Sequence, residues 1–337
     1  MAIAIKYKSI DLFAGIGGIR LGFAMTGRVE NVFGSDINPY AAKTYQENFA
    51  DNPLCDITQI DAESIPDFDI LLAGFPCQAF SIAGKKGGFD DTRGTLFFDV
   101  ARIIKAKQPQ AFLLENVKGL LMHKKGETLK TILNVLDQLG YQVKYKVLNS
   151  KDYGVPQNRE RIYIVGFKNG NAEFEFPQIS AGTTLNDILE KNPVSPKYYL
   201  SQRYFNTLQE HKKRHGEKGN GYGYIILKPE GIANAIVVGG MGRERNLLID
   251  EKVKLHPEYQ KYPKDINKQF VRTLTPREWT RLQGYPDSYK FPVSDTQAYK
   301  QLGNSVSVPV IHALANRVVA ILDNSASQIP IKKAANA

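Results

Sequence analysis

The sequence predicts an α/β protein with a doubly wound, mostly parallel sheet and a second, smaller, irregular β-rich domain. In the N-terminal half, apolar runs of strand length alternate with helical stretches of about 10–15 residues, a pattern typical of strand–helix–strand units. From about residue 168 the texture changes, because glycine clusters at 219–223 and 239–242 interrupt short strand-like runs. The first observation predicts the sheet and the second predicts the additional domain.

The elements are expected in strand–helix order as far as residue 167. Periodicity predicts strands at 7–13, 31–35, 69–75, 111–115, 141–148 and 161–167, and helices after a glycine turn at 15–18 and at 39–49, 95–107 and 127–139. Helices return at 276–283 and at 305–322. We therefore expect a first domain over 1–185 completed by a C-terminal helix at 303–323, a second domain over 186–271, a hinge over 272–302 and a frayed tail at 324–337.

Composition limits the class of protein. The net charge of +10 favours an anionic partner such as nucleic acid, although a solvated basic surface would give the same total. The excess is +2 over residues 1–167 and +4 over each of 168–271 and 272–337. Two cysteines, Cys55 and Cys77, predict neither a disulfide framework nor a metal cluster and fit a reducing cytoplasm. The sequence shows no signal-peptide pattern and no apolar run of the roughly 18 residues that a membrane span needs.

The glycine turn after the first strand is typical of a nucleotide-type pocket, because glycine lets the backbone approach a ligand closely. Arg20 occupies the place of the third glycine in the dinucleotide pattern, which counts against a nicotinamide dehydrogenase. Asp36 ends the second strand about 20 residues later, where it could accept hydrogen bonds from ribose hydroxyls. Asp56, after the next segment, is placed to meet an adenine amino group.

A second group of residues lies at predicted strand ends. Cys77 follows the strand at 69–75, and Glu115 and Arg161 lie at the ends of two other strands. A thiolate, a carboxyl group and a guanidinium could meet there over a flat heterocycle. No histidine is placed as a base, so papain-like acyl chemistry is poorly supported. The residues alone also allow a packed thiol, a capped strand end at Glu115 and a solvated ion cluster around Arg161.

Six short motifs stand out along the chain and together cover about residues 9–167 and 272–322. The motifs are Asp11-Leu12-Phe13-Ala14-Gly15-Ile16-Gly17-Gly18, Gly74-Phe75-Pro76-Cys77-Gln78, Glu115-Asn116-Val117, Gln157-Asn158-Arg159-Glu160-Arg161, Arg272-Thr273-Leu274-Thr275-Pro276-Arg277-Glu278 and Gly303-Asn304-Ser305-Val306. In these motifs and in their order, the chain strongly resembles the bacterial restriction–modification type of DNA (cytosine-5)-methyltransferase.

The resemblance implies the S-adenosylmethionine-dependent methyltransferase fold and a covalent mechanism. Cys77 would add to carbon 6 of cytosine and make carbon 5 nucleophilic. Glu115 would give a proton or strong hydrogen bond to ring nitrogen 3, Arg161 would hold the carbonyl oxygen, and Arg159 would hold the site around it. S-adenosylmethionine would be the cofactor. The residues implied for it are Phe13, Ala14, Gly15, Gly17, Gly18, Asp36, Ile37, Asp56, Ile57, Pro76, Asn304, Ser305 and Val306.

The same resemblance implies double-stranded DNA as the partner, with the target cytosine flipped out of the helix. The segment 79–95, with Lys85 and Lys86, would close behind the base and contact phosphate. The 186–271 domain would read the target in the major groove, and Arg243 and Arg245 are candidate guanine readers, although phosphate contact would look the same in sequence. We expect a cytoplasmic, nucleoid-associated monomer, with a possible cognate restriction endonuclease as a separate chain and no metal.

Two other functions fit parts of the pattern. A tRNA cytosine-5 methyltransferase on the same fold would share the six motifs, but the glycine-looped insertion favours reading of a duplex over shape-led RNA recognition. A catalytically silent DNA-binding protein or repressor would have no need of intact Cys77, Glu115 and Arg161. The sequence does not identify the recognised bases.

Overall fold

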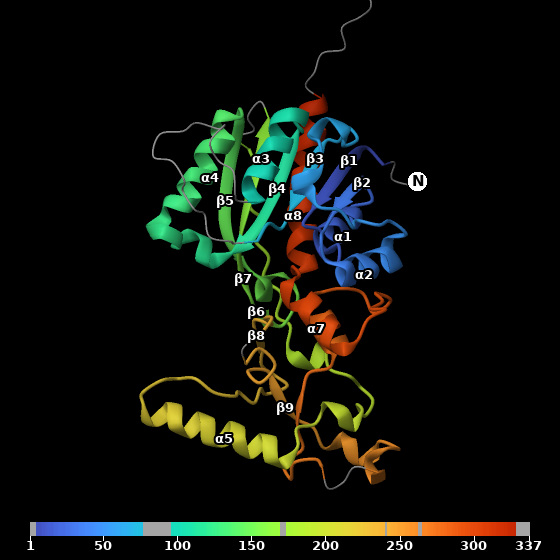
Figure 1. Ribbon diagram of the computed structural model, residues 1–337, viewed down its shortest axis with the longest axis vertical. Helices are drawn as coiled ribbons and strands as arrows, with labels where there is room; N and C mark the ends of the chain where they lie inside the picture. The colour runs from blue at the N-terminus through green and yellow to red at the C-terminus, as the bar shows by residue number, and fades with distance from the viewer. Residues whose placement is uncertain (1–4, 77–95, 169–172, 240, 262–264, 328–337) are drawn as a thin grey trace, which may run out of the picture.

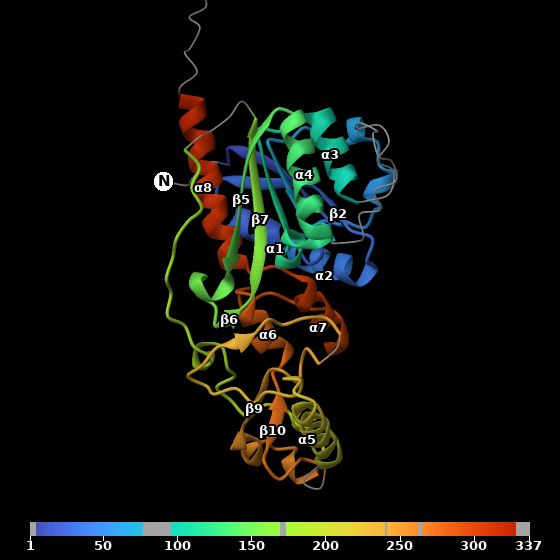
Figure 2. The same cartoon turned by 90° about the vertical axis from the view of Figure 1, so that its left-hand side faces the viewer.

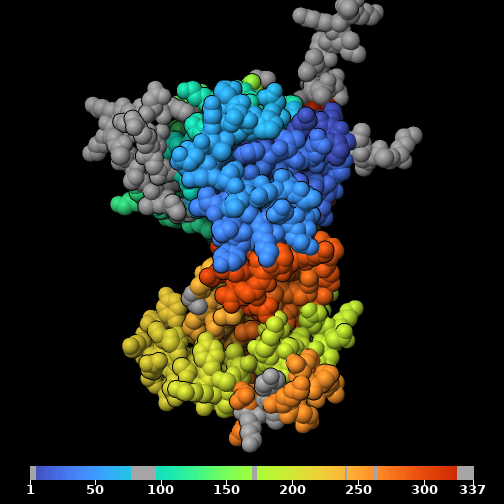
Figure 3. Space-filling view, turned by 45° about the vertical axis from the view of Figure 1, so that its right-hand side comes forward, coloured from blue at the N-terminus to red at the C-terminus, as the bar shows by residue number. Residues whose placement is uncertain are grey.

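The structure is a computed structural model that describes residues 5–76, 96–168, 173–239, 241–261 and 265–327. These residues form a larger α/β body and, below it in Figure 1, a smaller part that we call the lower region and define as residues 186–271. Helices α6 (Pro276–Leu282) and α7 (Asp295–Asn304) lie between the two (Figure 2). In the space-filling view, the orange residues around α6 and α7 join the blue upper body to the yellow and green lower region (Figure 3).

The body is built on a six-stranded sheet in the order β2-β1-β3-β4-β7-β5. β1, β3 and β4 pair in parallel, as do β1 and β2, while β7 pairs antiparallel with both β4 and β5. Five of the six strands therefore share one direction, which confirms the mostly parallel sheet. The strands are β1 Tyr7–Leu12, β2 Val29–Ser35, β3 Ile70–Ala73, β4 Ala111–Val117, β5 Tyr141–Asn149 and β7 Glu160–Lys168.

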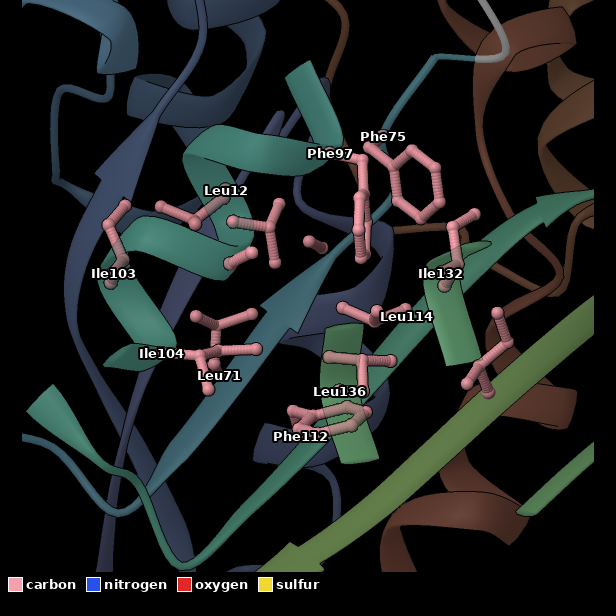
Figure 4. Packing of buried hydrophobic residues seen from close by; sticks show 14 of the residues in the cluster. Leu12, Leu71, Phe75, Phe97, Ile103, Ile104, Phe112, Leu114, Ile132 and Leu136 are labelled. Carbon is pink, nitrogen blue, oxygen red and sulfur yellow. The ribbon is translucent and has the colours of Figure 1, made fainter. Parts of the chain in front are cut away.

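Both faces of this sheet are buried, which explains the continuous apolar runs of its central strands. In β4, Phe112 and Leu114 point to one core and Ala111 and Leu113 to the other. Helices α3 and α4 cover the first face, where Phe97 and Ile132 join that core (Figure 4). Helices α1 and α8 cover the opposite face (Figure 2). The bounds are α1 Gly18–Ala24, α2 Pro39–Phe49, α3 Leu96–Lys107, α4 Glu127–Gln138 and α8 Val308–Ser327.

Helix α8 packs against the sheet of the body. The stretch Asp295–Asn324 has the length and apolar composition of a membrane span, but 67% of its most apolar part is buried inside the protein. Val310, Ile311 and Leu314 lie in the core beneath the sheet. Its hydrophobicity is therefore that of a core helix.

The lower region is less regular and contains an element that the sequence does not predict. Its strands are short: β8 is Ala233–Asn234, β9 Leu247–Ile249 and β10 Val271–Thr273, with β9 and β10 antiparallel, while β8 pairs with β6 (Gln157–Asn158). Its longest element is helix α5, Gln202–Glu217, which buries only Phe205 and Leu208. Such a polar helix gives a weak apolar periodicity, which is why the sequence does not reveal it among the short strands.

A buried ion pair anchors the connection between the two parts. Arg272, 1% exposed, binds Glu278 through two N–O contacts of 2.7 and 2.8 Å, and its Nε donates to Asp250 at 2.8 Å. Glu278 also accepts from the backbone N–H of Thr275, whose side chain caps α6 in return. This capping box and fork-shaped pair account for the spacing of the fifth motif.

Candidate active site

The glycine turn lies between β1 and α1 in a conformation that requires glycine. Gly15 and Gly17 have φ of 54° and 75°, in the left-handed region. A Cβ on Gly17 would be 2.3 Å from the ring of Phe49, and one on Gly18 would be 2.4 Å from Tyr285 Oη. The turn is thus packed tightly at Gly17 and Gly18. Phe13, two residues before Gly15, also has a positive φ of 54°.

A cavity of about 470 Å³ opens at this turn. Its volume suits a nucleoside-sized ligand, since small-molecule sites commonly span about 300–1,000 Å³. Twelve of the thirteen residues predicted to hold the cofactor line it, and Gly17 is the exception. Glu115, Arg159 and Arg161 line the same cavity. The structure therefore brings the described members of the two predicted groups together at one edge of the sheet.

The two aspartates are partly engaged in local structure. Asp36 accepts hydrogen bonds from the backbone N–H groups of Gly15 at 2.7 Å and Asn38 at 2.8 Å, so it ties the end of β2 to the glycine turn. Asp56 is exposed and accepts from the backbone N–H and hydroxyl of Thr58. A carboxylate oxygen has more than one acceptor site, so both groups keep capacity for a ligand. Ile37, with an exposed fraction of 72%, presents an apolar side chain beside them.

Glu115 and Arg161 form an ion pair across β4 and β7. The distance from Arg161 Nε to Glu115 Oε1 is 3.2 Å, and both side chains are largely buried. Burial raises the pKa of the Glu115 carboxyl above its ordinary value, although Arg161 and Arg159 oppose the shift. The carboxyl therefore retains a proton to higher pH than a solvated glutamate does, as a proton donor to a ring nitrogen requires.

The side chain of Asn116 positions the segment that precedes the predicted nucleophile, Cys77. Its side-chain amide donates to the carbonyl of Phe75 at 2.8 Å and so holds the segment after β3 against β4. Pro76, the next residue, lines the cavity. Cys77 follows in the chain and lies outside the described residues, as do Lys85 and Lys86. The amide of Asn116 is a positioning contact that sequence reasoning missed.

Arg159 is buried in the cavity wall and binds the backbone of other segments. It is 2% exposed, and its guanidinium donates to three backbone carbonyls: Ile236 at 2.6 Å, Gly303 at 3.1 Å and Ser305 at 2.5 Å. Burial and the neighbouring charge of Arg161 lower the pKa of Arg159. It therefore links the cavity wall to the lower region as well as lining the cavity.

The candidate DNA readers lie away from the cavity. Arg243 and Arg245 are both exposed, and the guanidinium of Arg243 lies over the ring of Tyr299 at 5.2 Å from its centroid. Neither residue lines the cavity. Among the described residues there is no cluster of three or more histidine, cysteine, aspartate or glutamate side chains that could hold a metal ion.

Helix α7 contributes residues that sequence reasoning missed. Its side chains Gln297, Lys300 and Gln301 line the cavity. The Gln301 amide joins α7 to α2, accepting from Thr44 and donating to the carbonyl of Tyr40. The nearest sequence signal is the Gly303-Asn304 pair at the end of this helix, but its polar composition concealed the helix itself.

Comparison with known proteins identifies the family of the chain. The family model of C-5 cytosine-specific DNA methylase matches residues 7–320. The chain is 56% identical over 326 residues to the Type II methyltransferase M.HpaII of Haemophilus parainfluenzae, with 95% of this chain and 91% of that protein covered. It is 49% identical to the Type II methyltransferase M1.ScrFI of Lactococcus lactis subsp. cremoris, with 95% and 80% covered.

Among solved structures, the S. pombe Dnmt2 methyltransferase superposes with a TM-score of 0.71 at 21% identity, covering 95% of this chain and 99% of that one. This likeness concerns the fold alone. The match of the family model over nearly the whole chain, together with the high identity of the relatives, decides the family. The chain belongs to the C-5 cytosine-specific DNA methylase family.

Proposed function

We propose that this protein transfers a methyl group from S-adenosylmethionine to carbon 5 of cytosine at a specific site in double-stranded DNA. The observation that carries the proposal is the shared cavity. Twelve of the predicted cofactor residues, Pro76 among them, line the same cavity as the Glu115–Arg161 pair. The relatives named as Type II methyltransferases favour duplex DNA over tRNA and a role as the modification half of a restriction–modification system.

The cavity fits the cofactor in size and in the chemistry of its lining. Ile37 and Ile57 offer apolar surface for an adenine ring, while Asp36 and Asp56 offer acceptors for ribose hydroxyls and the adenine amino group. The glycine turn, Phe13, Pro76 and the segment 304–306 would surround the remainder. When bound, S-adenosylmethionine supplies an electrophilic methyl group on a positively charged sulfur.

The residues of this chain would prepare the cytosine to accept that methyl group. The Cys77 thiolate forms a bond to carbon 6, and the electrons of the carbon 5–carbon 6 double bond move so that carbon 5 becomes nucleophilic. Glu115 supplies a proton to ring nitrogen 3, and Arg161 donates to the carbonyl oxygen. After carbon 5 takes the methyl group, the proton on carbon 5 leaves to a base and the bond between carbon 6 and sulfur breaks. Ring nitrogen 3 then returns its proton to Glu115.

A base inside a duplex cannot reach this cavity, so we propose that the target cytosine is flipped out. The lower region, 186–271, would read the target, with 272–302 as hinge and the body formed by 1–185 and 303–323. Arg243 and Arg245 remain candidates for base reading because both are exposed. Helix α5 adds a second basic surface, defined here as Lys212, Lys213 and Arg214, all exposed near its C-terminal end.

We further propose that the enzyme acts as a monomer on DNA in the cytoplasm, and that a cognate endonuclease would be a separate chain. Transfer of tritium from labelled S-adenosylmethionine tests the main proposal. Label should enter duplex DNA containing the target site and not tRNA. Label in tRNA alone would support the rival RNA methyltransferase, and bisulfite sequencing of DNA from expressing cells would identify the modified cytosine.

A further inference from the structure

Gln283 follows helix α6 and lies completely buried, with an exposed fraction of 0%. Its side-chain Nε2 donates to the carbonyls of Leu302 at 2.8 Å and Ser305 at 3.3 Å. Its own backbone carbonyl accepts from the N–H of Val308 at 2.8 Å. One residue thus binds both ends of the short connection between α7 and α8.

That connection forms part of the cavity wall. Gly303, Asn304, Ser305 and Val306 all line the cavity, and Gln283 does not. Because α7 ends at Asn304 and α8 begins at Val308, the carbonyls near this junction need partners outside their own helices. Each of the two carbonyls also has a second donor: Arg159 Nη2 donates to Ser305 at 2.5 Å, and the N–H of Ser305 donates to Leu302 at 3.2 Å. Loss of the Gln283 donors would remove one hydrogen bond from each carbonyl, so the connection would be held less firmly.

The orientation of the Gln283 amide is itself fixed. Its Oε1 lies 3.3 Å from Gln157 Nε2, which also donates to the carbonyl of Leu282 at 2.8 Å. Gln157 Oε1 in turn accepts from the backbone N–H of Ile236 in the lower region at 3.0 Å. Tyr285, two residues after Gln283, holds the same connection through a 2.6 Å hydrogen bond between its hydroxyl and that of Ser305.

We propose that Gln283 is a positioning residue that sets the affinity of the cavity for S-adenosylmethionine by holding the carbonyls of Leu302 and Ser305 in place. The inference rests on the proposed function, because it assigns the cavity to that cofactor. Gln283 would contact neither the cofactor nor the cytosine. Because the connection that it holds lines the cavity, substitution of Gln283 would change the affinity for S-adenosylmethionine and not the affinity for DNA.

The test compares Gln283→Met with Asn267→Leu in the full-length protein. Methionine keeps the length of the side chain and removes the amide donors. Asn267 is a matched control: it is equally buried, and its amide donates to two backbone carbonyls, of Leu200 at 2.9 Å and Val271 at 2.8 Å, but within the lower region. Gln283→Met loses three side-chain hydrogen bonds, two donated and one accepted from Gln157. Asn267→Leu loses four, two donated and two accepted from the N–H groups of Gln269 and Val271. Only the bonds of Gln283 are at the cavity.

We expect Gln283→Met to raise the KM and the calorimetric Kd for S-adenosylmethionine about tenfold while the KM for target DNA changes less than twofold. Asn267→Leu should lower the Tm about as much as Gln283→Met does, and it should leave the affinity for S-adenosylmethionine unchanged. Tyr285→Phe removes a single hydroxyl and serves if Gln283→Met does not fold; it should raise the cofactor KM about threefold.

Three results would overturn the inference. One is a cofactor Kd within twofold of wild type in folded Gln283→Met, and another is an unchanged cofactor KM in Tyr285→Phe where only that variant folds. The third is an equal loss of cofactor affinity in Asn267→Leu, which would reduce the effect to general stability. If wild-type protein itself bound no S-adenosylmethionine, the proposed function would fail first, and this outcome is distinct because it appears without any substitution.

Discussion

The α/β body and the lower region hold their polar side chains in different ways. In the body, the sheet is buried on both faces, and its functional side chains lie at one edge around a single cavity. In the lower region, the longest element buries only Phe205 and Leu208, and side-chain amides such as that of Asn267 hold the turns. A catalytic site needs rigid support, whereas a surface that recognises a binding partner needs exposed side chains.

The charged side chains of the two parts also differ in burial. Glu115 is buried beside Arg161, so its protonation depends on its surroundings. On α5, the four Lys and Arg residues and the two Glu residues are all exposed. Exposed charges attract a polyanion over a distance and are screened by salt, while buried charges act on a neighbouring atom. Substitutions in the two parts should therefore change different measurements.

The largest effect is expected from Cys77→Ala. Without a thiolate, carbon 5 of cytosine is not activated, so methyl transfer should fall by roughly 10⁴-fold or more. DNA affinity in a gel-shift assay should remain within a few-fold of wild type, because the lower region is intact. Full activity in this variant would refute the covalent mechanism.

Glu115→Gln should reduce the rate by about 10²-fold, since the amide can donate a hydrogen bond but cannot transfer a proton. The raised pKa of Glu115 means that wild-type activity should be lost as pH rises through that pKa, when the carboxyl loses its proton. In a pH–rate profile the variant should lack this alkaline decline. A decline of the same shape in both proteins would assign the titration to another group.

Replacing Lys212, Lys213 and Arg214 together with alanine should have the smallest effect on catalysis. The slope of log K for DNA against log salt should fall by about 2–3, because about 0.9 counterion is released for each phosphate contact. The rate at saturating DNA should be unchanged. Fluorescence anisotropy over a range of salt concentrations measures the slope.

The control for this surface is the pair Lys252→Ala and Lys254→Ala on the separate short helix Glu251–Leu255. The salt slope for DNA binding should be unaltered in this control.

Arg243→Ala tests base reading instead of phosphate contact. It should reduce the preference for target over non-target DNA by about 1–3 kcal/mol while the salt slope changes little. If Arg243→Ala instead weakened binding to all sequences equally, phosphate contact would be its role.

The sequence predicts the body well because its signals are local and repeated. Strand ends and glycine turns identified Glu115, Arg161 and the cavity-lining residues of the turn, and the structure places these residues together. The family resemblance added Asn304, Ser305 and Val306, which no local pattern indicates. The assignment of chemical roles to these residues stays a prediction.

The rest depends on contacts between distant segments, which no local pattern reveals. Helix α5 was missed because few of its positions are apolar, and α7 because its cavity-lining face is polar. Arg159 is expected to hold the site around the cytosine, but the carbonyls that accept three of its hydrogen bonds, those of Ile236, Gly303 and Ser305, lie far from it in sequence and are not predicted. The side chain of Gln283 likewise forms hydrogen bonds with residues that are far from it in sequence.

The central claim is that the sulfur of residue 77 adds to the target cytosine before the methyl group moves. Incubation with S-adenosylmethionine and a duplex bearing 5-fluorocytosine at the target tests it directly, because fluorine at carbon 5 does not leave as a proton and the adduct persists. Denaturing gel electrophoresis and peptide mapping should show a covalent complex attached at Cys77. Absence of a gel-stable complex under conditions where ordinary DNA is methylated would contradict the account.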